Sequence, residues 1–569
     1  VTLSDGVTRV AINGNLEPTV DIRAGTTNFN PTGITGNGTG FSPTPTSGTA
    51  TSADININRI IAPGGLVFLT NQYQPNPALS GNISVNSIQT ANLIGGGDVV
   101  IDSRGRITSR NMDVSGGNSV DLTFNGRGGD ITLISTSDIF IPYPSRIVSY
   151  GLGGGNITLK SNSAIIQEPP PSGSSDSSLL ESAVFNSGTA GDVTLEAPSM
   201  LFGGFIQSSI YGSGQGGKLI ITANSLSTDQ GFLLNYSEGG NTGPVIVNAQ
   251  EISLNNSVLG TETDSSSGGN AGDVEINTNT LVATNGAQVS SITTGIGNAG
   301  NVTVNADAIT LTGVIEDGGI FSGITSNVQR NAQGNGGTIK LQTRTLSMQD
   351  GAQIRTSIRG RGNAGNIEIR AEESIAIAGS VLATVSGRIV PIPSAILSEV
   401  RPGAEGEGGV IEVATRRLSV SNGAFISAST QSRGNAGSIT INVSESASFD
   451  GNPGAPFFPS GAYVGTLVGA SGKGGTLTIN TPSLSVTNGA QLEALTESVG
   501  DAGNIIINAR EVSLRGANTG LFSNTTPGST GNGGNISIRS PQIEIRDSAA
   551  ISVDSKGSGS GGNIAAQAN

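Results

Sequence analysis

GGTIKLQTRTLSMQDGAQIR, residues 336–355, contains one complete unit of a repeat that runs through most of this chain. The unit opens with glycine, continues with alternating aliphatic and polar residues, and turns at Asp350-Gly351 before a further apolar run. From residue 129 onward the opening pattern, a glycine followed by two alternating aliphatic residues, returns fourteen times. Repeats of this length indicate supersecondary units that stack on one another.

The spacing of the opening glycines has a period of two units. From Gly272 the next opening glycine, Gly300, lies 28 residues on, and the same step leads from Gly337 to Gly365. The step of 28 recurs from Gly409, Gly475 and Gly534. The step from the second glycine of one pair to the first glycine of the next pair exceeds 28 residues by 3 to 16. Every second unit therefore carries an insertion.

Each unit is predicted to form three short strands. In the unit at Gly337 these are Ile339–Leu341, Leu346–Met348 and Ala352–Arg355. Alternation with a period of two sends successive side chains to opposite faces. Strands that recur at a fixed interval predict an all-β fold, a parallel β-helix with about 28 residues per coil and insertions in alternate coils. A β-propeller is the alternative, but its blades usually run to about 40 to 45 residues.

The core of such a fold is narrow and is predicted to consist of stacked aliphatic side chains. We expect Ile367, Ile369, Ile439 and Ile441 to point inward and to stack on their equivalents in neighbouring coils. The low aromatic content, 4% with no Trp, agrees with a thin core.

The chain divides into an irregular and a regular part. Residues 129–569 hold the regular repeats, whereas residues 1–128 are predicted to form irregular coils with long loops. Degenerate copies of the first strand occur at Asp54–Ile57, Gly81–Val85 and Gly97–Ile101, and Gly33–Ser52 is predicted to be a long loop.

Composition limits the classes of function. The chain has no Cys and no His, which excludes Ser-His and Cys-His nucleophilic catalysis. The net charge of −14 disfavours nucleic acid and anionic lipid as partners. Without an apolar stretch of 18 residues, we expect no helix inserted in a membrane. We therefore predict no enzyme activity, no cofactor and no metal site.

The residue after the opening glycine is often Asn or Asp, and stacking would place these side chains in a row. The members are Asp130, Asn156, Asp192, Asp273, Asn301, Asn366, Asn504, Asn535 and Asn563. The row is interpreted as a ladder of hydrogen bonds or corner caps. The alternative is a carboxylate row that binds cations, but Thr338, Ser438 and Val410 occupy the same place in other coils.

A polysaccharide-degrading enzyme is the other class of function that β-helices suggest. Glycoside hydrolysis needs two carboxylates at a defined separation. The candidates are Glu316-Asp317, Asp264 and the stretch Glu399 to Glu407. A solvated acidic surface is the favoured interpretation, because these residues do not concentrate in one set of adjacent coils.

The insertions are the candidate contact loops. They fall between the second and third strands, at Gly313–Gly319, Ser380–Pro393, Gly451–Pro459 and Gly516–Thr519. If each unit is one coil, they should emerge along one edge as a ridge. The contact residues that we predict are Glu316, Asp317, Pro391, Ile392, Pro393, Pro456, Phe457, Phe458 and Pro459. The paired phenylalanines are either an exposed anchor or a cover that folds back on the coils.

The repeat motifs resemble those of filamentous-haemagglutinin-like exoproteins, particularly the cyanobacterial ones. The likeness lies in Gly-Asn-Ala-Gly-Asn-[Ile/Val] at Gly297–Val302 and Gly362–Ile367, and in Asn-Gly-Ala-Gln-[Val/Leu] at Asn285–Val289 and Asn488–Leu492. The resemblance implies a right-handed parallel β-helix outside the cell, exported by a two-partner secretion system through an outer-membrane pore.

One departure from that family lies near the beginning of the chain. Only Asn30-Pro31-Thr32-Gly33-Ile34 is similar to the signature of the family's secretion domain, which we expect to precede Val1.

The expected function is a secreted, non-enzymatic rod for adhesion or cell-surface architecture, at an extracellular or outer-surface location. Its expected partners are a host or neighbouring cell surface, a glycan, or copies of itself. The alternatives are a subunit of an extracellular filament that assembles end to end, and the polysaccharide-degrading enzyme.

Overall fold

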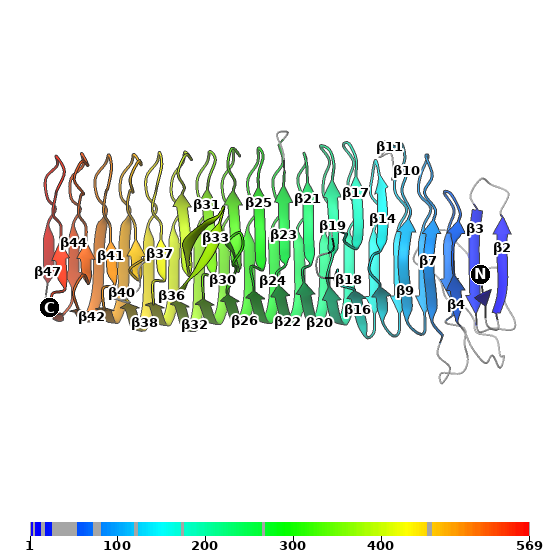
Figure 1. Ribbon diagram of the computed structural model, residues 1–569, viewed down its shortest axis with the longest axis horizontal. Coiled ribbons are helices and arrows are strands. Elements are labelled where there is room, and N and C mark those ends of the chain that lie inside the picture. Colours follow the sequence, from blue (N-terminus) through cyan, green and yellow to red (C-terminus); the bar gives the residue numbers. More distant parts are fainter. Residues whose placement is uncertain are drawn as a thin grey trace. The chain divides into compact units, whose positions relative to one another are not determined.

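The computed structural model describes residues 2–3, 6–12, 18–24, 54–71, 81–118, 123–171, 174, 176–264, 268–451 and 458–567. Over these residues the chain is an all-β parallel solenoid of about 17 turns with about 29 residues per turn (Figure 1). The predicted fold class is confirmed. The loop predicted at Gly33–Ser52 and the motif at Asn30–Ile34 lie outside the described residues.

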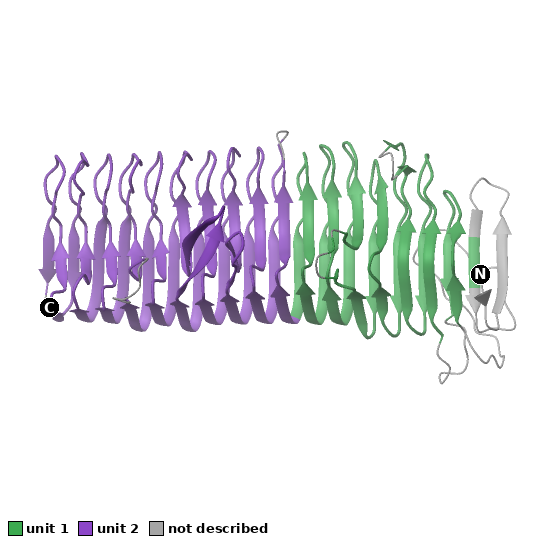
Figure 2. Cartoon of the chain, in the orientation of Figure 1, with its two compact units in different colours: residues 1–249 green, residues 250–569 purple. Residues whose placement is uncertain are grey.

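The chain forms two compact units, residues 1–249 and residues 250–569 (Figure 2). The strands that lie within the first unit are β1 Thr2–Leu3, β2 Gly6–Ile12, β3 Pro18–Ala24, β4 Ile55–Ile57, β5 Ile60–Ile61, β6 Val67–Thr70, β7 Ile83–Gln89, β8 Val99–Ser103, β9 Ile107–Asp113, β10 Gly117–Asn118, β11 Thr123–Phe124, β12 Ile131–Ser135, β13 Ile139–Ile141, β14 Arg146–Gly151, β15 Ile157–Ser161, β16 Ala164–Gln167, β17 Leu179–Val184, β18 Val193–Phe202, β19 Phe205–Ile210, β20 Leu219–Asp229 and β21 Phe232–Ser237. Strand β22 is Val245–Asn255.

The remaining strands belong to the second unit. They are β23 Val258–Thr263, β24 Val274–Thr284, β25 Gln288–Thr293, β26 Val302–Thr312, β27 Val314–Ile315, β28 Ile320–Phe321, β29 Gly323–Val328, β30 Ile339–Gln349, β31 Gln353–Ile358, β32 Ile367–Ala378, β33 Ser380–Val385, β34 Arg388–Pro393, β35 Ala395–Val400, β36 Ile411–Ser421, β37 Phe425–Ser427, β38 Ile439–Asp450, β39 Gly461–Tyr463, β40 Thr476–Thr487, β41 Gln491–Glu493, β42 Asn504–Arg515, β43 Gly520–Phe522, β44 Ile536–Arg539, β45 Gln542–Arg546, β46 Ala550–Ser552 and β47 Ile564–Gln567.

Successive coils of the second unit pair in parallel and in register. Strand β30 lies between β26 and β32, so that Ile339 pairs with Val302 on one side and with Ile367 on the other. The four predicted core residues, Ile367, Ile369, Ile439 and Ile441, are at most 1% exposed. The prediction of an inward aliphatic stack is therefore confirmed.

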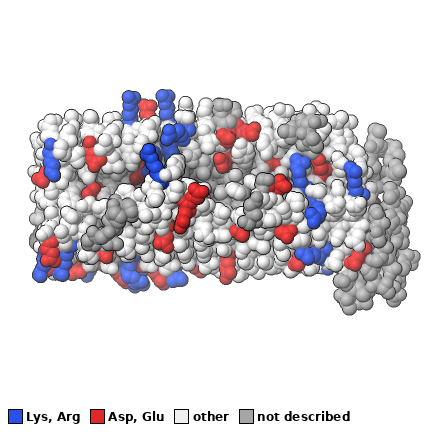
Figure 3. Space-filling model, viewed as in Figure 1, with Lys and Arg blue, Asp and Glu red and all other residues white. Residues whose placement is uncertain are grey.

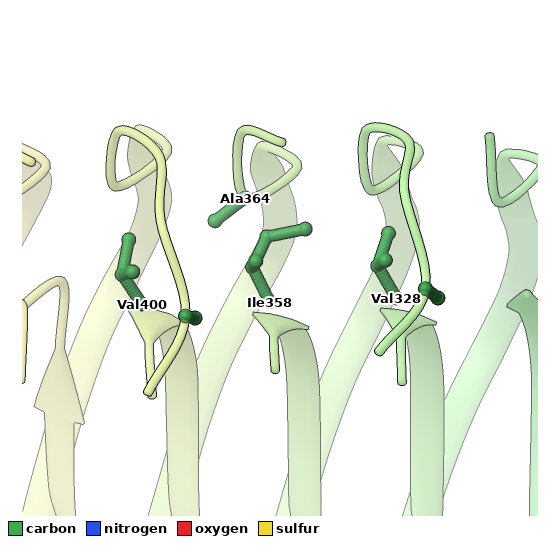
Figure 4. Packing of buried hydrophobic residues seen from close by; sticks show 6 residues of the cluster. Val328, Ile358, Ala364 and Val400 are labelled. Carbon is green, nitrogen blue, oxygen red and sulfur yellow. The ribbon is translucent and has the colours of Figure 1, made fainter. Parts of the chain in front are cut away.

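A second, smaller core closes the end of the coil beyond the third strand. Val328, Ile358 and Val400 end β29, β31 and β35 in register. They pack with alanines from the following loops, as Figure 4 shows for Ala364. The loops are therefore anchored to the solenoid by apolar contacts as well as by backbone hydrogen bonds.

The prediction of three separate strands per coil is wrong for most of the second unit. Ile339–Leu341 and Leu346–Met348 are parts of one strand, β30. At its bend the Thr343 hydroxyl donates to the backbone oxygens of Asp307, at 3.1 Å, and Thr345, at 3.0 Å. Because these contacts keep the corner hydrogen-bonded, the chain bends without leaving the strand conformation. Three separate strands do occur in the first unit, as β12, β13 and β14.

The opening glycine of each unit is required by the close approach of neighbouring coils. A Cβ atom on Gly365 would lie 1.9 Å from the backbone oxygen of Gly337. Inward hydroxyls from the third strands complete the contact: Ser326 accepts the Gly337 N–H at 2.9 Å and donates to the Gly300 oxygen at 2.8 Å. The most constant residue of the repeat is thus the place where two backbones touch.

The Asn and Asp row is a ladder of corner caps. The Asp273 carboxylate accepts the backbone N–H of Asn301 at 2.7 Å, and the Asn301 side chain accepts that of Thr338 at 2.9 Å. A second ladder runs three residues earlier, where Asn298 caps Asn335 and Asn335 caps Asn363. The corner-cap interpretation is confirmed. Among the described residues, no group of three or more His, Cys, Asp or Glu could hold a metal ion.

The solenoid extends through the described part of residues 1–128. Strand β4 pairs in parallel with β7, and β6 pairs in parallel with β8, which places the copies at Asp54–Ile57, Gly81–Val85 and Gly97–Ile101 in the stack. Strands β2 and β3 pair antiparallel with each other, and β1 pairs antiparallel with β4.

Replacing Ile439 by Asp tests the core. The carboxylate would be buried without a partner, so we expect the free energy of unfolding to fall by more than about 4 kcal/mol. Chemical denaturation followed by circular dichroism measures this loss. The control is Thr440→Asp, one position away and pointing outward; an equal loss in both variants would contradict the assignment of the inward row.

Replacing Gly365 by Ala tests the backbone contact. The added Cβ meets a fixed backbone oxygen rather than a movable side chain, so we expect a loss of about 4 kcal/mol or more. Gly95→Ala is the matched control, because the nearest atom to its Cβ would lie at 3.8 Å. The steric explanation is overturned if both variants melt at the wild-type temperature.

Candidate contact surface

Two of the four insertions form antiparallel hairpins. The first consists of β27 and β28 and carries Glu316 and Asp317 at its turn. The second consists of β33 and β34 and includes Pro391, Ile392 and Pro393 in its returning strand. They emerge between β26 and β29 and between β32 and β35, which is where the sequence placed them.

The two hairpins touch each other across the coil that separates them. The N–H of Gly318 donates to the oxygen of Thr384, and the N–H of Thr384 donates to the oxygen of Glu316, both at 2.8 Å. The two hairpins cover the Asp350-Gly351 turn. A Cβ atom added to Gly351 would lie 2.8 Å from Cγ1 of Val314. The predicted ridge is confirmed for this pair of insertions.

The hairpin ridge exposes aliphatic side chains. Ile389 is 71% exposed, Leu382 49% and Ile320 47%. Exposed apolar residues that gather on one element mark a surface suited to contact with a partner. Three such residues therefore lie on the two hairpins that contact each other.

The third insertion is described only in part, because Pro456 and Phe457 lie outside the described residues. The ring of Phe458 packs 5.7 Å from that of Phe425 and remains 42% exposed. The oxygen of Pro459 accepts the hydroxyl of Tyr463 at 2.7 Å. Phe458 therefore lies against Phe425 and is also exposed, which fits both interpretations of the paired phenylalanines.

The fourth insertion also contacts the coil before it. The oxygen of Asn518 accepts the side-chain amide of Gln491 at 3.1 Å. Because Gln491 begins the third strand β41, this short insertion reaches the outward side of the same strands that border the other insertions.

Beside the hairpins, the outward side of the third strands carries a cluster of arginines. The guanidinium carbon of Arg355 on β31 lies 4.5 Å from the ring centre of Phe321 in the first hairpin. Its Nη1 donates to Gln353 at 3.3 Å, whereas its buried Nε has no partner. Burial, followed by the charges of Arg359 and Arg401, lowers the pKa of Arg355 to about 9.

Little negative charge balances these arginines. Glu399 is 4% exposed and pairs with Arg401, whose Nη1 lies 3.0 Å from its Oε2. The pKa of Arg359 is lowered by burial and by the charges of Arg401 and Arg330. Neighbouring cations therefore repel one another here, and an anion placed among them would relieve the repulsion.

Further along the same strands the charge reverses. Glu493 lies on β41, and burial, followed by the charge of Glu497, raises its pKa to about 7. Burial and then the charge of Glu493 raise the pKa of Tyr463 on β39. Carboxyl groups with a raised pKa are also found in enzyme active sites. The pKa of Glu262 is likewise raised, by burial and then by the charge of Asp264.

A buried network in the first unit was not expected from the sequence. The carboxylate of Glu181 on β17 is 1% exposed and accepts hydrogen bonds from the hydroxyls of Tyr150 and Tyr211 and from the amide of Gln207. Burial, followed by the charge of Glu181, raises the pKa of both tyrosines. The signal that could have found it is the scarcity of Tyr, with 6 in the chain.

Aromatic stacking accompanies this network. The ring of Phe185 lies 4.3 Å from that of Phe124 and 4.8 Å from that of Tyr211. The Phe185 ring is therefore stacked against both neighbouring rings. With three donors on the carboxylate, the network is well satisfied and stabilises the stack.

The acidic residues proposed for catalysis are not brought together. Asp264 accepts the hydroxyl of Thr294 at 2.9 Å, and Glu407 accepts the backbone N–H of Asn435 at 3.0 Å. Oε2 of Glu405 lies 3.6 Å from Nε of Arg361. Glu316 and Asp317 occupy the hairpin turn. Asp264, Glu405 and Glu407 therefore make separate contacts and do not form a shared centre.

A shallow groove of about 740 Å³ runs along the strand bends of β36 to β44. Its wall includes a row of amides, in which Asn480 donates to Asn442 and Asn508 donates to Asn480, each at 2.7 Å. The sequence analysis did not identify it. The amides hydrogen-bond from coil to coil, which makes the row a part of the fold.

The described residues contain no helix able to span a membrane. No protein-family model matches the sequence, and no match was found among curated proteins or solved structures.

Proposed function

We propose that the protein is a secreted, non-enzymatic scaffold that mediates adhesion or builds cell-surface architecture. The observation that carries this proposal is the segregation of its surface: uniform coils provide a stack, while insertions and unbalanced charges gather beside the third strands. A stable framework with variable loops on one side is a common way to present binding residues. The partner would be a cell surface or a glycan at an extracellular location.

The resemblance of the repeats to filamentous-haemagglutinin-like exoproteins supports the extracellular location. It implies export by two-partner secretion through an outer-membrane pore. The absence of Cys agrees with this route, because a chain without disulfides can cross a pore in the unfolded state.

Assembly of copies end to end is the second candidate. A solenoid coil whose strand edge is unpaired can pair with the coil of another chain. Electron microscopy of the purified protein separates the candidates, because fibres support assembly and single particles that bind cells support adhesion.

Removing the longer hairpin tests the adhesive role. Residues 379–394 are replaced by Asn-Gly-Ala, the sequence that joins the equivalent positions in the coil of Asn422. We expect the melting temperature to change by no more than a few degrees, because the stacked coils remain. Binding to cell surfaces and glycan arrays should fall at least tenfold.

Two further variants sharpen this experiment. Leu382→Ser combined with Ile389→Ser keeps the hairpin but removes exposed apolar area, and should also weaken binding. Lys340→Ser, on the first strand of a coil, is the control that should bind normally. Undiminished binding without the hairpin would contradict the proposal.

The absence of depolymerising activity is a separate prediction. Incubation with uronate-containing and neutral polysaccharides should yield no reducing ends or unsaturated products, because the chain has no His base and its carboxylates are dispersed. Cleavage that disappears in Glu493→Gln would refute the non-enzymatic assignment and place the active site at β41.

A further inference from the structure

The outward side of β31, β35, β37, β39 and β41, which we call the pairing face, has three zones. The N-terminal zone is basic and holds Arg355, Arg359 and Arg401, with Glu399 as the paired carboxylate. The C-terminal zone is acidic and holds Glu493 and Glu497. In Figure 3 blue atoms gather over β31 and β35, and red atoms lie over β41.

The zone between the charges is apolar. The ring of Phe425 on β37 lies 5.5 Å from that of Tyr463 on β39 and 5.7 Å from that of Phe458. Val468, just beyond β39, is 77% exposed. An apolar centre with charged margins is the usual anatomy of a protein interface.

The spacing of the charges along the solenoid is fixed by backbone hydrogen bonds. Gln431 donates to the oxygen of Val400, Leu467 to that of Thr430, and Glu497 to that of Thr466, at 2.7 to 2.9 Å. Arg401 directly follows Val400, so Arg401, Gln431, Leu467 and Glu497 occupy one row in successive coils. Arg401 and Glu497 are therefore three strand spacings apart, about 14 Å.

This row is complementary to itself when it is reversed. Consider a two-fold axis in the plane of contact that crosses the row between Gln431 and Leu467. Rotation about this axis generates a second copy that runs antiparallel to the first. Arg401 then lies opposite Glu497 of that copy, and Glu497 lies opposite its Arg401. The same operation puts Phe425 opposite Gly461 of the copy and Tyr463 opposite Ser427. An interface of this kind is isologous, so each contact occurs twice.

We propose that two copies of this chain associate laterally and antiparallel through the pairing face. The occupant is a second copy rather than another acidic molecule, because the reversed row offers Arg401 a carboxylate and Glu497 a guanidinium in the same contact. An unrelated polyanion would engage the basic zone alone. The pairing does not depend on the adhesive role proposed above.

Charge reversal tests the pairing. Sedimentation velocity of the full chain, over a range of concentrations at low salt, should show a monomer–dimer equilibrium that shifts toward monomer at high salt. Arg401→Glu and Glu497→Arg should each raise the dissociation constant at least tenfold. The double variant restores both ion pairs across the axis and should return within about threefold of the wild type.

Controls separate pairing from folding. Arg359→Glu alters an exposed charge of the same zone and should also weaken the dimer, while Arg433→Glu, an exposed arginine outside the pairing face, should not. Melting curves identify any variant that fails to fold. A wild type that stays monomeric at every concentration, or a double variant no better than the singles, overturns the proposal.

Cross-linking tests the orientation. The chain has no Cys, so Gln431→Cys and Leu467→Cys provide unique thiols. A bismaleimide that spans the roughly 10 Å between packed sheets should join the two variants to each other when they are mixed. Stronger cross-linking of either variant to itself would contradict the antiparallel register.

Discussion

The in-register hydrogen-bond ladder between successive coils is the interaction on which the rest of the structure depends. It turns each position of the repeat into a row, so that Ile339, Ile367, Ile411 and Ile439 follow one another along the core. The tight approach of the opening glycines is the geometric condition for that ladder. Every surface property described above, from the corner caps to the three zones of the pairing face, follows from rows that the ladder holds in line.

The second unit alternates between two kinds of coil. Coils with a short turn use Asn-Gly or Asp-Gly at positive φ, as at Asn422-Gly423 with 54° and 84°. They also carry threonine at the strand bend, at Thr278, Thr343, Thr415 and Thr481. Coils with insertions have Ala or Val at that bend. A short turn leaves room for the loops on either side to meet above it, as the hairpins do over Gly351.

The sequence predicts what repeats and does not predict what occurs once. The core row, the corner caps and the position of the insertions follow from a pattern seen in many units, because each copy confirms the others. The fusion of two predicted strands into β30 was missed, since short apolar runs suggest two strands whether or not the corner stays hydrogen-bonded. The Glu181 network and the contact between Gly318 and Thr384 were missed because each joins single residues, and only the folded register shows which of them become neighbours.

The corner ladders also have a direction. In both ladders of the second unit the side-chain oxygen belongs to the earlier coil and the backbone N–H to the later one, as in Asp273 to Asn301. A coil that has already formed therefore presents acceptors to the segment that follows it in the chain. Folding that proceeds from the N-terminal side meets a template at each step, which suits a polypeptide that emerges from a narrow exit one end first.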